Sequence, residues 1–346
     1  MTGYRLDRRQ FALGAAGAAL AFAGPAWAVA APRPRPALDA FRQHARELGA
    51  RALIVMRGED VLVSDGEVAE VRRIASCRKS FVNALYGMAV GEGKINLDAT
   101  LAEVGIDDYA PLSDVEKRAT IRQLLQARSG VYIPASAETP AMRAARPARG
   151  SHPPGSFWYY NNWDFNVLGE IYQRVTGEGL FTAIEHRLAR PLGWQDFDAL
   201  RHMQWGYEPE SPRFGAYNMW MSARDMVRFG QLFLNRGRWN GHQLIPESWI
   251  DESTRVYSTT GFNGILGGYG YLWWIATDRE GKDPLGLPLG AYTAAGNGGR
   301  YITIFPAQNL VVAVQPDERD NQPPVPLYAD HNAYSLLLRQ LLDAVG

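Results

Sequence analysis

Short apolar runs near the two ends of the chain predict β-strands. Residues 52–56 and 61–63 are apolar and flank a polar turn, which is the pattern of a β-hairpin. Near the C-terminus, residues 301–305 and 310–314 flank a second turn and predict another hairpin. The aromatic run 269–276 is also expected to be extended.

Apolar residues with helical spacing fill most of the chain between these strands. A long helix is expected to begin near Ser76 and to stop at the glycines of residues 91–93. Ser222 and Asp225 have the spacing of a capping box, which predicts a helix over 223–235. The other predicted helices cover 37–48, 120–127, 163–175, 178–189 and 328–345.

Strands at both ends with helices between them predict a mixed α/β (α+β) protein whose sheet is assembled from the two chain termini. We expect residues 31–75 and 262–346 to form the sheet-containing α/β domain. Residues 76–261 would form a mainly helical domain inserted into it. The sequence after residue 36 contains no internal repeat or low-complexity tract that would indicate another organisation.

The first thirty residues have the composition of an export signal. Three arginines precede an uncharged apolar stretch over 11–23, and Ala26-Trp27-Ala28 provides an A-x-A cleavage pattern. The run around Arg8 and Arg9 resembles the twin-arginine signal of bacteria. The apolar stretch is too short to span a bilayer. We therefore expect residues 1–30 to be removed, leaving a periplasmic or extracellular protein with no stable membrane span. An uncleaved amphipathic anchor is the alternative.

Charge and composition narrow the classes of partner. The 346 residues include 36 Lys+Arg and 36 Asp+Glu, and removal of the signal with its three Arg and one Asp leaves a charge of −2. This balance argues against a nucleic-acid partner, which would require a basic surface. The single cysteine excludes a disulfide framework, and no histidine or cysteine pair has metal-binding spacing. We expect no metal and no cofactor, and oligomeric state is not indicated.

Ser76 and Lys79 form the first candidate site. Lys79 is one of only four lysines and follows Ser76 by three residues, so both side chains would lie on one face at a helix start. A lysine can act as the base for a serine hydroxyl when burial lowers its pKa. Because a lone S-x-x-K also arises by chance, a capped helix with an exposed lysine is the alternative.

Two further segments carry candidate site residues. A Pro-Gly turn and an aromatic run lead into Tyr160-Asn161-Asn162 before a predicted helix, although these residues could also be core aromatics and a helix cap. Residues 294–300 contain Gly296, Gly298 and Gly299 before a predicted strand, and such glycines permit close backbone approach. A phosphate-binding loop is disfavoured, because the segment lacks the lysine and Ser/Thr of such a loop. A plain β-bulge or turn is the structural alternative for this segment.

Together, the three segments resemble the penicillin-recognising serine hydrolases, particularly the class C β-lactamase-like branch. That family has S-x-x-K, then Tyr-x-Asn, then a Lys/His-x-Gly element on an edge strand, and supporting similarities run from about residue 37 to 345. The resemblance implies a β-lactamase/transpeptidase-like fold. Its antiparallel sheet would be flanked by helices, with the active site in the cleft between the sheet-containing and helical domains.

The resemblance also implies roles for individual residues. Ser76 would be the acylated nucleophile, and Lys79 and Tyr160 would share the proton transfers, with the first acceptor left open. The backbone N–H groups of Ser76 and Asn297 would form an oxyanion hole. The residues assigned to substrate binding or the oxyanion hole are Asn162, Gly296, Asn297 and Gly298.

One position departs from the family pattern. Ala294 stands where lysine or histidine usually helps to hold a substrate carboxylate, and whether Arg300 replaces it is open. The A-x-G-x-G-G form instead resembles the branch containing 6-aminohexanoate-dimer hydrolase and esterases. We therefore expect an exported serine hydrolase for small-molecule esters or linear amides, with poor β-lactam turnover.

Several alternatives stay open. A D-alanyl carboxypeptidase or β-lactamase of the same family would use the same residues, and a penicillin-binding sensor would acylate but deacylate slowly. Ser-His-Asp hydrolysis is disfavoured because no G-x-S-x-G elbow occurs. Cys77, inside the S-x-x-K motif, is either a small core residue or a reactive thiol beside a helix start.

Overall fold

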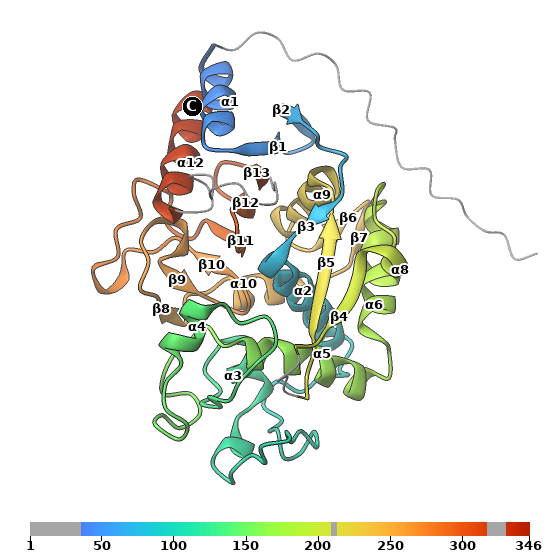
Figure 1. The fold of residues 1–346 in the computed structure, drawn as a ribbon. Helices are drawn as coiled ribbons and strands as arrows, with labels where there is room; N and C mark the ends of the chain where they lie inside the picture. The colour runs from blue at the N-terminus through green and yellow to red at the C-terminus, as the bar shows by residue number, and fades with distance from the viewer. Residues whose placement is uncertain (1–35, 209–212, 317–329) are drawn as a thin grey trace, which may run out of the picture.

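The computed structural model describes residues 36–208, 213–316 and 330–346 (Figure 1). The predicted export signal over residues 1–30 lies outside the described residues, as does the start of the helix predicted over 328–345.

One eight-stranded antiparallel sheet combines both ends of the chain. Its strand order is β2-β1-β13-β12-β11-β10-β9-β8. The N-terminal strand β1 pairs with β13, and Val55 lies opposite Val312. The strands are β1 (Ala50–Arg57), β2 (Asp60–Gly66), β8 (Ser258–Thr259), β9 (Gly268–Tyr269), β10 (Trp274–Ile275), β11 (Tyr292–Gly296), β12 (Arg300–Phe305) and β13 (Leu310–Pro316). This arrangement confirms the predicted α/β fold with a sheet built from both termini.

Helices cover both faces of this sheet. On β12, Ile302 contacts Gly230 of α9 (Ala223–Leu234), whereas its neighbour Tyr301 stacks on Tyr334 of α12 (His331–Val345). Successive side chains on a strand point to opposite faces, so α9 and α12 lie on opposite sides. The N-terminal helix α1 (Pro36–Glu47) packs beside α12 (Figure 1). Both faces of the sheet are therefore buried, which explains the continuous apolar runs of β12 and β13.

The remaining helices include the central helix α2 (Arg78–Gly91), which is buried over most of its length. Three short turns accompany them: η2 (Glu116–Arg118), η4 (Gly264–Leu266) and η5 (Arg279–Gly281). The other helices are α3 (Ile121–Leu125), α4 (Pro140–Ala145), α5 (Asn162–Thr176), α6 (Leu180–Ala183), the π-helical η3 (Ile184–Ala189), α7 (Arg190–Leu192), α8 (Ala199–His202) and α10 (Glu247–Ser253).

Several elements differ from the sequence predictions. A small sheet of β3 (Arg72–Arg73), β5 (Ala216–Met221) and β4 (Met203–Gly206) was not predicted, nor was the hairpin β6 (Arg238–Trp239) and β7 (His242–Gln243). The aromatic run 269–276 is broken by a turn at Leu272, whose φ is +60°. The domain division at residues 75/76 and 261/262 stays a prediction.

Ser222 caps α9 as expected, but only half of the predicted capping box forms. The Ser222 side chain accepts a hydrogen bond from the Asp225 backbone N–H. The Asp225 carboxylate accepts from the backbone N–H groups of Gln195 and Asp196 instead of returning to Ser222. The acidic residue therefore ties α9 to the preceding loop.

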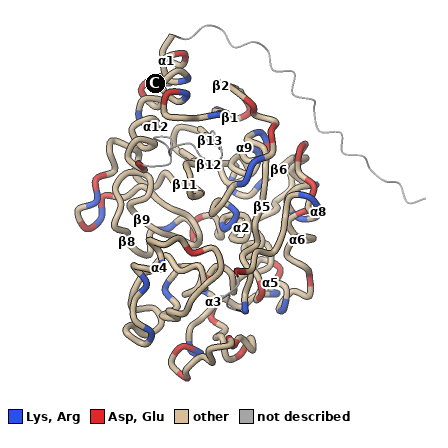
Figure 2. The backbone as a smooth tube through the Cα atoms, in the orientation of Figure 1, with Lys and Arg blue, Asp and Glu red and all other residues tan. Residues whose placement is uncertain are grey.

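Acidic and basic residues are interspersed along the described chain (Figure 2). Many form surface ion pairs, for example Arg236 with Glu247 and with Asp251. Within residues 36–208, 213–316 and 330–346, no helix is both long and apolar enough to cross a membrane.

Candidate active site

Ser76 lies in a short turn, η1 (Ala75–Cys77), between β3 and α2. The turn is anchored on one side by a 3.0 Å hydrogen bond from the Ile74 N–H to the Met219 carbonyl of β5. Ala75 has φ +47°, a left-handed conformation that is unfavourable for a residue with a side chain. The predicted helix thus starts two residues later than expected, and Ser76 projects from a tight, strained turn.

Lys79 links Ser76 to Tyr160. Its Nζ lies 2.8 Å from Ser76 Oγ and 2.8 Å from Tyr160 Oη. Ser76 and Lys79 meet because they are three residues apart at the start of α2, as the spacing predicted. Tyr160 comes from the loop before α5, so only the tertiary structure brings it to the pair. The exposed-lysine alternative is wrong, since Lys79 is only 2% exposed.

Burial separates the proton affinities of these groups. Desolvation lowers the pKa of Lys79 well below its usual value, and the neighbouring Arg78 charge lowers it further. Desolvation raises the pKa of Tyr160 to about 12, despite a hydrogen bond with Ser76. Near neutral pH the phenol therefore keeps its proton. The amine of Lys79 is the group in this trio that can accept the proton of Ser76.

Aromatic rings enclose the trio. The Tyr160 ring stacks on Trp274 at a centroid distance of 5.1 Å and lies 4.9 Å from Phe165. Lys79 Nζ lies 4.6 Å from the ring centroids of both Tyr160 and Phe165. Trp158 continues the aromatic wall through its contact with Trp274. These rings exclude water from the amine, which is the physical cause of its desolvation.

The two asparagines after Tyr160 have different environments. Asn161 caps α5, because its side-chain oxygen accepts from the Trp163 backbone N–H at 3.2 Å. The cap alternative is thus right for Asn161. Asn162 donates from Nδ2 to the Ala137 carbonyl at 2.6 Å, and its buried Oδ1 has no hydrogen-bond partner among the described residues. That oxygen is an unused acceptor two residues from Tyr160.

A buried carboxyl group supports this loop from behind. Asp164 accepts hydrogen bonds from the Ser129 hydroxyl and from Asn161 Nδ2. Desolvation raises its pKa well above the usual value for aspartate. Asp164 therefore joins the segment after α3 to the loop that carries Tyr160.

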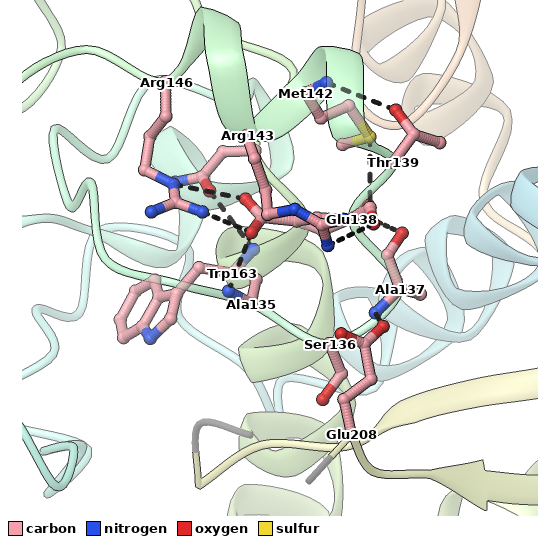
Figure 3. Close-up of polar contacts among 12 residues, drawn as sticks. Ala135, Ser136, Ala137, Glu138, Thr139, Met142, Arg143, Arg146, Trp163 and Glu208 are labelled. Carbon is pink, nitrogen blue, oxygen red and sulfur yellow. Dashed lines mark hydrogen bonds and ion pairs between the residues drawn. The ribbon is translucent and has the colours of Figure 1, made fainter. Parts of the chain in front are cut away.

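The segment over residues 135–146, which includes α4, contacts Asn162 through the Ala137 carbonyl. Figure 3 shows the polar contacts around Glu138 within this segment. Glu138 pairs with Arg146 and accepts from the Ala135 N–H, which closes the loop on itself. The Ala137 N–H donates to Glu208 at 2.9 Å while its carbonyl accepts from Asn162. Sequence reasoning missed this loop, because its contacts are made mostly through backbone groups.

The third predicted segment lies against the Ser76 turn. A Cβ atom on Gly296 would stand 2.4 Å from the Ile74 carbonyl oxygen and 3.2 Å from Cys77 Sγ, so only glycine fits at the end of β11. The next residue, Asn297, begins a turn in which Gly298 and Gly299 have φ +93° and +85°. The Gly296 contact brings the Asn297 backbone beside the turn that carries Ser76.

The position of β11 in the sheet differs from that of an edge strand. It lies between β10 and β12, but β10 pairs only with Tyr292 and Thr293. Residues 294–296 therefore have a strand partner only on the β12 side within the part of the chain that the structure describes.

Arg300 and Cys77 are structural neighbours of this segment. Arg300 is 3% exposed and donates to the backbone carbonyls of Arg73 and Asn297, each at 2.5 Å. Its side chain thus holds the turn at Asn297. The Cys77 thiol is fully buried, contacts the Ala294 and Arg300 carbonyls, and has a pKa raised by desolvation to about 12. The structure favours the core role of Cys77 over the reactive-thiol alternative.

An open pocket of about 540 Å³ adjoins the aromatic wall at Trp158. Its polar and apolar lining comes from Arg128, from residues 156–158, from residues 256–261 around strand β8, and from η5. The lining residues are Arg128, Ser156, Phe157, Trp158, Val256, Tyr257, Ser258, Thr259, Thr260, Gly261, Arg279 and Glu280. Among the described residues, no group of three or more histidine, cysteine or acidic side chains is placed to hold a metal ion.

A family model described as beta-lactamase matches residues 37–331. The chain belongs to the β-lactamase family. The match covers S-x-x-K, Tyr-x-Asn and the glycine-rich segment, so the resemblance predicted from these motifs is confirmed, and the protein is a hydrolase of this family.

Individual relatives of this β-lactamase-family chain are distant. The 6-aminohexanoate-dimer hydrolase of Paenarthrobacter ureafaciens is 23% identical over 281 residues, which cover 71% of this chain and 69% of that protein. A penicillin-binding protein homologue from Caulobacter crescentus superposes with a TM-score of 0.65 at 19% identity, covering 91% of this chain and 99% of that one. An octameric penicillin-binding protein homologue from Pyrococcus abyssi gives 0.62 at 19% identity, with 89% and 77% covered. These structures confirm the predicted fold.

Proposed function

We propose that this β-lactamase-family protein is an exported serine hydrolase that cleaves carboxylic esters or linear amides through an acyl-enzyme on Ser76. The observation that carries the proposal is the position of the Lys79 amine, 2.8 Å from both Ser76 Oγ and Tyr160 Oη and buried among aromatic rings. A desolvated amine beside a serine hydroxyl is an activated nucleophile.

Acylation begins when the neutral Lys79 amine takes the proton from Ser76 Oγ as that oxygen attacks the substrate carbonyl carbon. The backbone N–H groups of Ser76 and Asn297 stabilise the negative charge on the carbonyl oxygen. The C–O or C–N bond then breaks, and the proton held by Lys79 passes through Tyr160 to the departing alcohol or amine. Ser76 is left as an ester of the substrate acyl group.

Deacylation reverses these roles. Water takes the place of the leaving group and attacks the ester carbonyl while Tyr160 and Lys79 accept its proton. Collapse of the tetrahedral intermediate returns a proton to Ser76 Oγ and releases the carboxylic acid. Asn162 Oδ1, which has no hydrogen-bond partner among the described residues, is a candidate acceptor for a substrate amide N–H.

The site favours linear substrates over β-lactams for two reasons. Ala294 cannot bind a carboxylate by a charge-assisted hydrogen bond, and the Arg300 guanidinium donates to the backbone carbonyls of Arg73 and Asn297. The aromatic wall from Trp274 to Trp158 leads to the open pocket, which has room for an extended chain. The name of the Paenarthrobacter ureafaciens relative, 6-aminohexanoate-dimer hydrolase, refers to a linear amide of this kind.

One substrate screen tests the proposal. Purified protein is assayed with p-nitrophenyl esters, linear amides, D-amino-acid peptides and nitrocefin, with Ser76→Ala as the blank. Ser80→Ala is the matched control, because its hydroxyl is buried one turn away and bonds the Leu272 carbonyl. We expect ester or linear amide turnover that Ser76→Ala abolishes and Ser80→Ala retains. Wild-type activity in Ser76→Ala would overturn the nucleophile assignment.

Intact-mass measurement during turnover separates an enzyme from a sensor. We expect the acyl-enzyme to decay as fast as product forms. A stable adduct without turnover would instead support the penicillin-binding sensor, and preferential cleavage of D-amino-acid peptides would support the carboxypeptidase. Detection of a processed N-terminus in the periplasm or medium tests the proposed export.

A further inference from the structure

Arg78 is a buried cation with no acidic partner among the described residues. Its side chain is only 3% exposed, and no ion pair joins it or Lys79 to a carboxylate within the described residues. An unpaired buried charge is costly, because desolvation is not offset by an opposite charge. The burial of Arg78 directly before Lys79 therefore has a free-energy cost that other contacts must offset.

The contacts of Arg78 point to the Ser76 turn. Its Nη1 donates to the Ala75 carbonyl at 2.9 Å, and Ala75 is the residue in the left-handed conformation immediately before Ser76. The guanidinium carbon lies 5.2 Å above the ring centroid of Tyr217, which stabilises the charge through the ring face. Arg78 Nε has no hydrogen-bond partner among the described residues. The side chain thus secures a strained turn while its charge stays unneutralised.

The charge lies next to the amine that the proposed reaction needs in its neutral form. The groups with an electrostatic influence on Lys79 are Arg78 and Cys77, and the Tyr160 hydroxyl bonds it directly. The groups around Arg78 are Tyr217, Tyr160, Arg73 and Cys77. None of these is a carboxylate, so nothing among them favours the ammonium form as an acid would.

We infer that Arg78 is a positioning residue for catalysis: its guanidinium secures the turn that presents Ser76 and places a buried positive charge beside Lys79, which keeps that amine neutral. This inference rests on the proposed function. It assigns to Arg78 two separable effects, one on geometry and one on protonation, and the second predicts a specific change in pH dependence.

Arg78→Met, Arg78→Lys and wild type are compared through the pH dependence of kcat/KM for a p-nitrophenyl ester. Loss of the positive charge in Arg78→Met makes Lys79 easier to protonate, so the acid limb should move upward by about one pH unit. Arg78→Lys retains a charge and should keep the limb near its wild-type midpoint while lowering the rate at all pH values. Arg228→Met, a nearly buried arginine on α9 that bonds the Leu192 and Gly193 carbonyls, is the matched control and should leave the limb in place.

Two outcomes would overturn the inference. One is an Arg78→Met profile that is scaled down equally at every pH with an unmoved acid limb, since a purely structural role predicts that result. The other is an equal limb shift in Arg228→Met. If Arg78→Met does not fold by near-ultraviolet circular dichroism, Arg78→Gln replaces it, because an amide can still donate to the Ala75 carbonyl.

A second readout does not require the natural substrate. An alkyl p-nitrophenyl phosphonate should add a phosphonyl group to Ser76, detectable by intact mass, with the same pH limb and the same upward movement in Arg78→Met. Absence of modification in wild type, or modification of Ser76→Ala, would count against the proposed nucleophile. Modification of Ser76 with an unmoved limb would count against the Arg78 inference alone.

Discussion

The Lys79 amine lies 2.8 Å from the Tyr160 hydroxyl oxygen, inside a shell of aromatic rings. The same burial acts in opposite directions on the two groups, since it lowers the pKa of the amine and raises that of the phenol. Between those two pKa values both groups are uncharged. The pair can therefore exchange a proton with Ser76 and with a leaving group directly, because neither group has to be neutralised first.

Tyr160→Phe should lower kcat strongly while keeping the ring in place. The substitution removes the hydroxyl that bonds Lys79, and loss of a positioned proton donor costs roughly 10²- to 10⁴-fold in rate. Tyr159→Phe is the control, because that hydroxyl bonds the Met142 carbonyl. Steady-state kinetics with a p-nitrophenyl ester measure both variants. Equal rates for Tyr160→Phe and Tyr159→Phe would rule out the proton-transfer role.

The pH dependence of kcat/KM should show an acid limb well below the usual lysine pKa. Lys79 must be neutral to accept the Ser76 proton, and its lowered pKa means that activity is lost only as pH falls through that lowered value. Tyr160 ionises only near pH 12, so it should cause no alkaline loss below about that pH. Initial rates from pH 5 to 10 give the limb. Activity that appears only above pH 10 would contradict a lowered pKa of Lys79.

Gly296→Ala should impair both stability and turnover. Its Cβ would stand 2.4 Å from the Ile74 carbonyl oxygen, which forces β11 away from the Ser76 turn. Overpacking of this kind costs about 1–3 kcal/mol. Gly179→Ala is the control, since it lies outside the pocket and a Cβ there would meet only side-chain atoms, the nearest at 3.6 Å. Thermal melting and kcat are measured together. An unchanged kcat in a stable Gly296→Ala protein would contradict the assignment of the Asn297 N–H to the oxyanion hole.

Nitrocefin should be a poor substrate compared with a p-nitrophenyl ester. Ala294 cannot donate the charge-assisted hydrogen bond that a basic residue would give at this position, which is worth about 1.5–3 kcal/mol or roughly 10- to 150-fold in kcat/KM. Absorbance assays on one enzyme preparation compare the two substrates. Nitrocefin turnover as efficient as ester turnover would show that the carboxylate is held by another group.

Cys77 should resist thiol reagents in the folded protein. The thiol is fully buried and its pKa is raised to about 12, so thiolate is scarce at neutral pH. Titration with 5,5′-dithiobis(2-nitrobenzoate) should detect one thiol in guanidinium chloride and none in buffer. Rapid labelling of the native protein would restore the reactive-thiol alternative.

Local patterns in the sequence predicted most of the fold. Alternating and continuous apolar runs predicted β1, β2, β12 and β13, and helical spacing predicted α1, α5, α9 and α12. The sheet was correctly expected to join both chain ends. The small sheet containing β3, β4 and β5 was missed, because β3 has only two residues and pairs with β5 more than a hundred residues away, and β4 has only four residues and carries little local signal.

The sequence by itself determined the partnership of Ser76 and Lys79, since residues three apart at a helix start must share a face. Only the tertiary structure decided what that pair can do. It brings Tyr160 across 81 positions to the amine and fits Gly296 against the Ile74 carbonyl. It also buries Arg78 beside Lys79 with no acidic partner in the part of the chain that the structure describes. The physical reason is that the proton affinity of a lysine depends on its solvation and on neighbouring charges. Both are set by packing between distant segments and not by the residues next to it in the chain.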